Sequence, residues 1–212
     1  MTSSQHIIDV FLYFFELSIH SLLHGRGVYP ASFFEPRGAY AGLSAPMLRH
    51  PELCDGICAL LASMRPMLLG NAVECALLVL LDPAGRAVER YTFAVDVGAA
   101  AAGGATQAHA EAQLGTALHL LQRDARRRAT LPPDCTFTVQ LRTHGPLGEQ
   151  AGLPLWAHVD PADAAGGGDG GGSGDGGGGG EVGALPLRAR APIKAIRLGP
   201  LTVDVFVESA VY

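Results

Sequence analysis

The feature that most constrains the fold is a continuous apolar run at Cys75–Leu81. Such a run predicts a strand covered on both faces, because a strand with one face in water alternates apolar and polar residues. A turn composition follows at Asp82-Pro83-Ala84-Gly85. The chain then returns through apolar positions at Val88, Tyr91, Phe93 and Val95. The segment therefore predicts a β-hairpin.

Three helices are predicted around this hairpin by apolar residues at helical spacing. The first, residues 6–24, has a wide aromatic face, which indicates deep burial. The second, residues 50–69, begins near Pro51, which suits a first helical turn, whereas Pro66 is expected to kink or shorten it. The third, residues 106–128, ends in arginines that complement the helix dipole.

The C-terminal part of the chain is less regular. Residues 135–141 alternate apolar and polar side chains, which predicts a half-buried strand. Residues 166–180 are almost entirely glycine, and such a tract cannot pack, so a flexible linker is predicted. A last strand is predicted at residues 201–207. The order of elements indicates an α+β domain with helices on one face of an antiparallel sheet.

Composition and net charge limit the kinds of fold and ligand that the chain can have. The chain has 212 residues, of which 48% are hydrophobic, enough for one domain with a sizeable core. Its formal net charge of −5 argues against nucleic-acid binding by the overall field. A local basic patch is compatible with that charge, and the arginine cluster at 123–128 could contact phosphate or an acidic partner. A solvated helix end is the plainer alternative for this cluster.

The expected setting is a soluble protein of a reducing compartment. Asp9, Glu16 and Arg26 interrupt the first apolar stretch, so no membrane span is predicted. The N-terminal residues lack the basic region and cleavage site of a signal peptide. Four cysteines in a chain of this length do not indicate a disulfide scaffold.

Two pairs of residues with ligand chemistry are spaced four apart, His20 with His24 and Cys54 with Cys58. Metal sites need further ligands, and none lies close to either pair in the sequence. Ordinary core or surface histidines and small buried cysteines are therefore the preferred interpretation. No metal is predicted.

Catalytic motifs are absent from the sequence. The glycine tract lacks the Gly-Lys-Ser/Thr end of a phosphate loop, and no Gly-x-Ser-x-Gly elbow occurs. The acids Asp82, Glu89 and Asp96 flank the hairpin and are expected to be solvated turn or edge charges. These observations predict a binding module that is not an enzyme and has no cofactor. The alternative, a small enzyme, would need His20, His24 or the hairpin acids to converge in one pocket.

An ordered set of short motifs carries a resemblance to a known family. The motifs are Val28-Tyr29-Pro30, Phe33-Phe34, His50-Pro51-Glu52-Leu53, Val73-Glu74, Val88-Glu89, Cys135-Thr136-Phe137-Thr138-Val139, and Pro192 with Lys194. Together they resemble the HORMA-domain accessory subunits of translesion DNA polymerase zeta, the mitotic-arrest-deficient-like proteins. The resemblance runs from about residue 7 to residue 208, with the glycine tract as an insertion.

This resemblance implies a single HORMA domain over residues 1–212. Its core, at about 6–143, would consist of three helices packed on an antiparallel sheet. A C-terminal safety belt, at about 144–208, would contain the insertion 166–180 and close over an extended closure peptide. The peptide would lie against the sheet as an added strand.

The resemblance also implies residues for the closure-peptide site. Trp156 matches a belt tryptophan that packs on the bound peptide, with a plain core position as the alternative. Gly56 stands where the family has a peptide-contacting tyrosine, and its neighbour Ile57 is assigned to the same site. Gly115 stands where the family has an arginine that pairs two HORMA domains, so pairing by that route is not expected.

A second implied surface binds the C-terminal domain of a Y-family scaffold polymerase. Its residues here are Arg190, Lys194, Asp204 and Phe206. Lys194 matches the family, whereas Phe206 replaces a tyrosine and Asp204 replaces a glutamine. Arg190 replaces a leucine, and the loss of an apolar anchor is expected to weaken the contact unless the partner differs too.

The resulting prediction is a nuclear, non-catalytic adaptor in DNA damage tolerance and repair. It would clamp a closure peptide of the polymerase zeta catalytic subunit and bridge it to the scaffold polymerase, without direct contact to nucleic acid or membrane. The alternative within the same fold is a checkpoint or chromatin adaptor. That adaptor would bind another closure peptide and inhibit a ubiquitin ligase in cell-cycle control.

Overall fold

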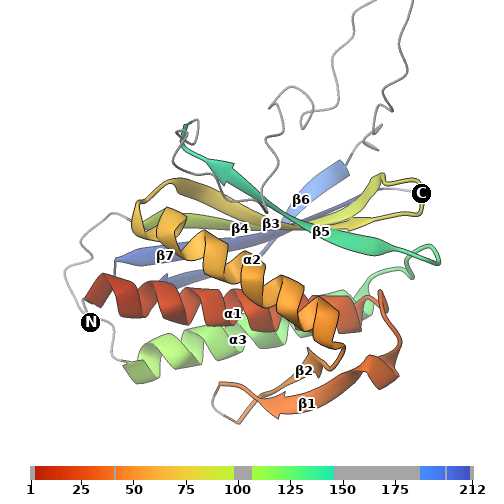
Figure 1. Cartoon of the computed structure of the whole chain (residues 1–212), viewed down its shortest axis with the longest axis horizontal. Coiled ribbons are helices and arrows are strands. Elements are labelled where there is room, and N and C mark those ends of the chain that lie inside the picture. Colours follow the sequence, from red (N-terminus) through yellow and green to blue (C-terminus); the bar gives the residue numbers. More distant parts are fainter. Residues whose placement is uncertain (1–2, 41, 98–106, 146–186, 199, 211–212) are drawn as a thin grey trace, which may run out of the picture.

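The computed structural model describes residues 3–40, 42–97, 107–145, 187–198 and 200–210. Three long helices cover one face of a five-stranded sheet, and a two-stranded hairpin lies beyond the helices (Figure 1). In chain order the elements are α1 (Ser3–Gly25), η1 (Ala31–Phe33), β1 (Phe34–Gly38), β2 (Ser44–Leu48), α2 (Pro51–Leu69), β3 (Val73–Leu81), β4 (Ala87–Val97), α3 (Gln107–Arg127), β5 (Thr136–Thr143), β6 (Leu187–Leu198) and β7 (Leu201–Ala210).

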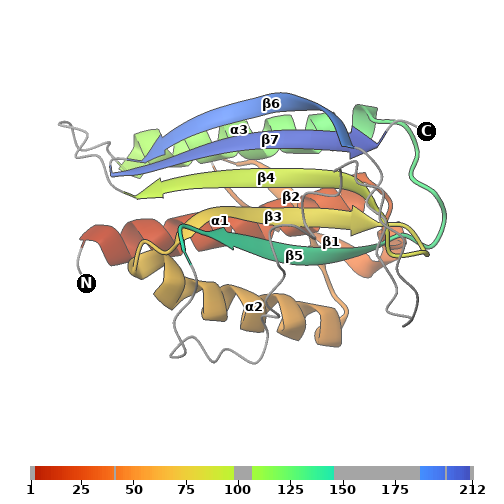
Figure 2. The same ribbon diagram turned by 90° about the horizontal axis from the view of Figure 1, so that it is seen from above.

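The large sheet has the strand order β5-β3-β4-β7-β6, and every neighbouring pair is antiparallel. The predicted hairpin forms its β3 and β4 strands, with Leu78 opposite Tyr91. The C-terminal strand β7 pairs with β4, and β6 forms the edge beyond it. β5 forms the opposite edge (Figure 2). The sheet and its helical layer confirm the fold predicted from the sequence.

Strand β3 is buried on both faces, as its apolar run predicts. One alternating set joins the main core under the helices, namely Ala76, Leu78 and Leu80. The other set forms a second, smaller apolar cluster, with Cys75, Leu77 and Val79. A strand buried on both faces needs no polar positions, which explains the unbroken pattern.

Helix α1 is central to the main core. Phe11, Phe14 and Phe15 are fully buried, and the Phe15 ring meets the Phe93 ring of β4 edge-on at 4.9 Å between centroids. By length and mean hydropathy, Gln5–Gly25 is apolar enough to cross a membrane, contrary to the sequence-based expectation. However, 61% of that window is buried inside the fold, so packing against the sheet accounts for its apolar character.

A buried ion pair joins α1, the sheet and the end of α3. Arg26 donates to both carboxylate oxygens of Glu89, at 2.8 and 2.9 Å. Arg26 also donates to the carbonyl oxygens of Ala125 and Ala129, and the Tyr91 hydroxyl donates to Glu89 at 2.9 Å. The prediction that Glu89 is a solvated charge is therefore wrong. Its partner lies far away in sequence, where no local pattern reveals it.

Three local features differ from the sequence-based prediction. The β1–β2 hairpin lies where no strand was predicted, because β1 is short, largely exposed and contains Pro36. β6 is a long strand where only irregular motifs were expected, because arginines and Pro192 interrupt its apolar pattern. α2 continues through Pro66 to Leu69, so this proline lies within the last turn and does not end the helix.

Candidate functional site

The two edges of the large sheet differ in how far they can accept another strand. β6 lies beside α3, and the backbone N–H of Arg197 donates to the side-chain oxygen of Gln113 at 2.9 Å. Pro192 has no N–H to offer, and Arg190, Lys194 and Arg197 add charge to the strand. Proline, charged side chains and a covering helix are the usual means of blocking an edge strand. The β6 edge is therefore protected.

The β5 edge lacks these devices. β5 contains no proline, and no strand of the described part of the chain pairs with the edge that faces away from β3. Arg142 is its one charged residue, and it lies 3.7 Å from Glu74 of the neighbouring β3. An unprotected edge presents unpaired backbone N–H and C=O groups in the geometry that an added strand requires.

Apolar side chains line this open edge. Phe137, Val139 and Leu141 lie opposite Leu80, Leu78 and Ala76 of β3, so they are on the helical side of the sheet. All three are half-buried, and we call them the β5 row. Half-buried apolar side chains beside unpaired backbone groups can supply the side-chain pockets of a strand-addition site.

The β5 row continues into neighbouring elements. The Tyr29 ring contacts the Phe137 ring at 6.3 Å between centroids, and burial raises the pKa of the Tyr29 hydroxyl. On α2, Leu53 and Leu60 are also half-buried against the core. Figure 2 shows α2 along the side of the sheet that ends in β5. The open edge and α2 therefore form one candidate surface.

The closure-peptide residues implied by the resemblance are only partly described. Gly56 is exposed on α2, and a Cβ atom at this position would meet nothing within 4 Å. Its neighbour Ile57 is buried in the main core. These two residues therefore lie on different faces of α2, and Gly56 leaves open space where a larger side chain would fit. Trp156 and the glycine tract at 166–180 lie outside the described residues.

The scaffold-polymerase residues implied by the resemblance lie at the far end of the sheet from β5. Asp204 and Phe206 share the outer face of β7, away from the helices, since their neighbours Val203, Val205 and Val207 are in the core. The Arg190 guanidinium lies over the Phe206 ring at 3.8 Å from its centre. A shallow hollow of about 370 Å³ is lined by Pro192, Ile193, Lys194, Ala195, Asp204, Val205 and Phe206.

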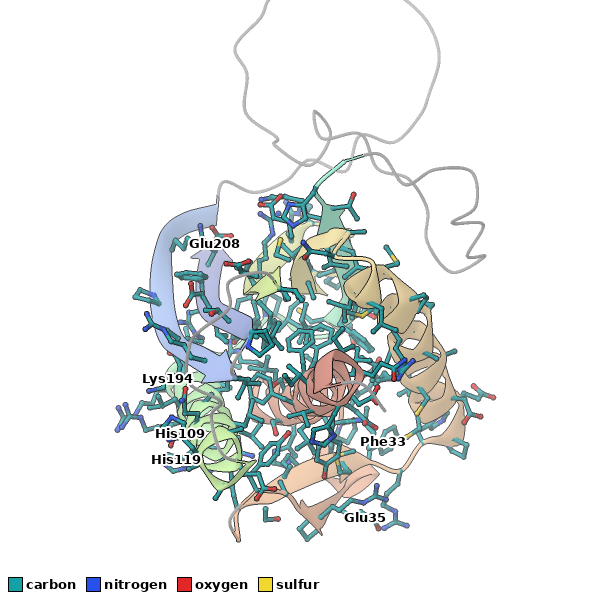
Figure 3. All side chains as sticks on the ribbon, turned by 90° about the vertical axis from the view of Figure 1, so that its left-hand side faces the viewer. Phe33, Glu35, His109, His119, Lys194 and Glu208 are labelled. Atoms are coloured by element: carbon teal, nitrogen blue, oxygen red, sulfur yellow. The ribbon has the colours of Figure 1, made fainter. Side chains whose placement is uncertain are left out.

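Lys194 is set slightly apart from the other three. It pairs with Val205, whose side chain is buried in the core, and an irregularity in the ladder separates it from Pro192. Figure 3 shows Lys194 on the side of β6 that borders α3. The structure thus brings Arg190, Asp204 and Phe206 to one face, with Lys194 at its rim.

The histidines of α1 do not converge with other reactive groups. His20 is buried, and its Nδ1 accepts a hydrogen bond from the backbone N–H of Leu48 at 3.4 Å. Burial, assisted by Arg37, lowers the pKa of His20 to about 4. His24 packs its ring edge-on to Phe34. Within the described ranges, no three His, Cys, Asp or Glu side chains lie close enough to hold a metal ion.

The remaining chemistry-bearing residues have local roles. The Cys54 thiol donates to a backbone carbonyl at 3.2 Å, whereas Cys58 is exposed, so the expectation of a buried pair is wrong for Cys58. Asp82 accepts hydrogen bonds from backbone N–H groups of its own turn, and its carboxylate pairs with Arg86 at 2.7 Å. Asp96 is exposed, as expected. These two acids lie on the β3–β4 hairpin, whereas both histidines lie on α1.

Several known proteins are similar to this chain in sequence. No protein-family model matches the chain. The chain is 31% identical over 141 residues to human mitotic spindle assembly checkpoint protein MAD2B, and this match covers 66% of each chain, just under two thirds. It is 27% identical over 149 residues to the DNA polymerase zeta processivity subunit of Arabidopsis thaliana, covering 69% of each chain. The chain is therefore similar in sequence to MAD2B and to the polymerase zeta subunit, over about two thirds of its length.

Solved structures share the HORMA fold at low identity. A chain of the mitotic checkpoint complex superposes with a TM-score of 0.73 at 17% identity, covering 97% of this chain and 99% of that chain. C. elegans HTP-2 bound to the HIM-3 closure motif gives a TM-score of 0.67 at 15% identity, covering 98% and 92%. These likenesses confirm three helices on an antiparallel HORMA sheet.

Sequence reasoning predicted β5 as a half-buried strand but did not identify its row as a binding surface. The alternation of Phe137, Val139 and Leu141 was visible. Their place at an edge depends on strand order, which follows from long-range pairing with β3 and from the distant position of β6. No local signal in the sequence carries that information.

Proposed function

We propose that this HORMA protein is a non-catalytic adaptor that binds an extended closure peptide at the open edge of β5. The observation that carries the proposal is the combination of an unprotected edge with the half-buried β5 row. An added strand gains backbone hydrogen bonds from the edge and specificity from the side-chain pockets. The structural neighbour HTP-2, bound to a closure motif, supports this mode of binding.

The topology supports a belt over residues 144–208. β5 ends at Thr143 at one edge of the sheet, whereas β6 begins at Leu187 at the opposite edge. The chain between them has to pass from one edge to the other. A peptide added to β5 would lie where that passage begins. Closure of the passage over the peptide, with Trp156 as an anchor and Gly56 and Ile57 nearby, is the arrangement we propose.

The proposed source of the peptide is the catalytic subunit of translesion DNA polymerase zeta. The polymerase zeta processivity subunit of Arabidopsis thaliana among the relatives supports this choice. We further propose that the face formed by Arg190, Asp204 and Phe206, with Lys194 at its rim, binds the C-terminal domain of a Y-family scaffold polymerase. The hollow on that face supports a docking role. The adaptor would then act in the nucleus, in DNA damage tolerance.

A second candidate function uses the same edge with a different peptide. The human relative carries the name of a mitotic spindle assembly checkpoint protein, which supports a checkpoint or chromatin adaptor. Such an adaptor would bind another closure peptide and inhibit a ubiquitin ligase. A panel of candidate closure peptides separates the two functions, since only the true partner is expected to bind tightly and dissociate slowly.

The test is a titration of the full chain with a labelled proline-containing peptide from the polymerase zeta catalytic subunit of the same organism. Fluorescence anisotropy reports binding, and Trp156, the single tryptophan, gives an intrinsic signal. We expect submicromolar affinity and slow release. The variant V139D introduces a charge into the β5 row and is expected to weaken binding at least tenfold, or about 1.4 kcal/mol.

The matched control is Q140D, on the same strand but on the opposite face of the sheet, opposite Leu77. It adds the same acidic group and is expected to leave affinity within about threefold, or about 0.7 kcal/mol. A milder variant, V139T, keeps the test valid if V139D does not fold. Equal losses in V139T and Q140D, both folded, would place the peptide elsewhere.

A further inference from the structure

Strand β6 carries a β-bulge where it approaches the hollow on the outer face of β6 and β7. Arg188 pairs with Ser209, and the next regular pair joins Ala191 to Val207. Two residues of β6 therefore stand opposite a single residue of β7, and the second of the two is Arg190. An extra residue of this kind bends a strand and redirects its side chains.

The bulge decides which face of the sheet Arg190 occupies. In a strand without the extra residue, Arg190 would stand opposite Val207, whose side chain is in the core under the helices. With the bulge it reaches the outer face, where its guanidinium carbon lies 3.8 Å from the centre of the Phe206 ring. Bulges often lie beside functional sites, because they re-aim a side chain. The position of this bulge therefore indicates a functional role for Arg190.

A second β-bulge follows directly on β6. Pro192 pairs with Phe206 and Lys194 pairs with Val205, so Ile193 is the extra residue. All five of these residues line the hollow of about 370 Å³. The same irregular stretch of β6 thus forms the hollow and places an arginine over the aromatic ring in its wall.

Arg190 keeps its hydrogen-bond donors available for a partner. Its side chain is exposed, and none of the ion pairs in the described part of the chain includes it. A guanidinium group stacks on an aromatic ring through its face and binds a carboxylate through two N–H groups at its edge. The ring also holds the guanidinium in place, so less side-chain freedom is lost when a carboxylate binds.

The acids of β7 on this face do not neutralise Arg190. Glu208 is paired with Arg90 of β4, at 3.6 Å. Asp204 lies two residues beyond Phe206 on the same outer side of β7, where it lines the hollow. The surface therefore has an unpaired cation at one end and a carboxylate at the other, which gives it an electrical polarity that a partner has to match.

We propose that Arg190 selects a partner that places a carboxylate against its N–H edge, beside an apolar side chain that enters the hollow. This inference rests on the proposed docking of the scaffold polymerase at the same face, and it names the chemistry that the partner needs there. The apolar side chains of Pro192, Ala195 and Phe206 in the hollow favour a protein surface, since contact with a nucleic-acid backbone needs only cations.

The residue at position 190 thus determines which partner fits. The leucine that the family has at this position would make an apolar contact, whereas Arg190 makes a charge-assisted hydrogen bond with a carboxylate. A partner with an apolar residue opposite Arg190 would leave the guanidinium without an acceptor and would bind more weakly. A partner with an acidic residue there would be preferred.

The test measures binding of the full chain to the C-terminal domain of the Y-family scaffold polymerase of the same organism. The domain is used unphosphorylated, so that the anion it offers is a carboxylate. Arg190→Met keeps an unbranched stem and removes the charge, and it is expected to weaken binding about fivefold or more at about 50 mM salt, with a shallower salt dependence than wild type. The matched control Arg197→Met makes the same change on the same outer face, opposite Thr202 and outside the hollow. It is expected to bind within about twofold of wild type.

Charge reversal identifies the carboxylate of the partner. Arg190→Glu is expected to weaken binding more than Arg190→Met, because two carboxylates then face each other. The acidic residues of the partner domain are changed to lysine one at a time, and one of these changes is expected to restore most of the affinity that Arg190→Glu loses. Circular dichroism verifies that each variant is folded.

The outcomes separate this inference from the proposed bridge. Equal or tighter binding of Arg190→Met would overturn the inference and leave the bridge in place, because the partner would then make an apolar contact at this position. Equal losses in Arg190→Met and Arg197→Met, or the absence of any restoring lysine variant, would also contradict it. No binding of the domain by the wild-type chain would instead remove the bridge itself, and the inference with it.

Discussion

The guanidinium carbon of Arg190 lies 3.8 Å from the centre of the Phe206 ring, on the outer face of the C-terminal hairpin. An arginine over an aromatic ring contributes about 0.5–1 kcal/mol at an exposed site. Arg190 therefore covers the ring that the proposed scaffold-polymerase contact would use. A partner on this face has to displace Arg190 or use it, for example through an acidic side chain of its own.

Phe206→Ala removes the ring that Arg190 covers and that the proposed scaffold polymerase would contact. We expect it to weaken binding of the Y-family C-terminal domain at least tenfold, because a partly buried aromatic ring is a typical anchor. Thr202→Ala, on the same strand and the same outer face, is the control and is expected to bind like wild type. Isothermal titration calorimetry measures both. Unchanged affinity of a folded Phe206→Ala protein would remove this face from the proposed bridge.

Glu89→Gln is expected to destabilise the fold by about 3–5 kcal/mol, because it leaves the buried Arg26 without a compensating charge. Glu35→Gln removes a carboxylate from an exposed pair whose closest atoms are 3.9 Å apart, and it is expected to cost less than about 1 kcal/mol. Urea unfolding gives the free energy of unfolding for each protein. Similar losses for both variants would mean that the Arg26–Glu89 pair adds little to stability.

Stability is expected to fall on acidification because of His20. Its pKa is about 4 in the folded protein and about 6.5 in an unfolded chain, so the unfolded state binds the proton more readily. The contribution is fully present above about pH 6.5 and is lost as the pH falls toward 4, by about 3 kcal/mol in total. Unfolding of wild type and His20→Gln across this range isolates the effect. Parallel pH profiles would contradict it.

Deletion of residues 166–180 is expected to leave closure-peptide affinity within a few-fold of wild type. Loop-closure entropy changes slowly with length, since doubling a flexible loop costs about 0.6 kcal/mol. Anisotropy with the labelled closure peptide measures the change. A loss of more than about a hundredfold, or about 2.7 kcal/mol, would show that the glycine tract takes part in binding.

The fold was largely predictable because its main elements carry their own periodicity. The unbroken run of β3 follows from burial on both faces, and the wide aromatic face of α1 follows from its central place in the core. β1 and β6 were missed because prolines and charges suppress alternation in exposed or edge strands. Their partners β2 and β7 follow them directly in the chain, so what hid these two strands is the missing alternation and not the distance of the partner.

The candidate sites were less predictable than the fold. The β5 row is available for binding only because the strand order places β5 at an edge of the sheet. The Arg190–Phe206 contact depends on how β6 and β7 are paired. Of the arginine cluster at 123–128, Arg123, Arg126 and Arg127 are exposed at the end of α3, as the alternative of a solvated helix end predicts. Arg128, from the same cluster, is instead held by Asp124 and Ser209.

The inequality of the two sheet edges also limits how copies of this chain can associate. A sheet with two open edges can recruit a neighbour on each side and grow without end, as fibrils do. Here growth can start at β5 but cannot pass beyond β6, where Pro192 and α3 end the ladder. Edge-to-edge association therefore terminates after one event. The protein can keep one reactive edge available for a partner without acquiring the capacity to polymerise.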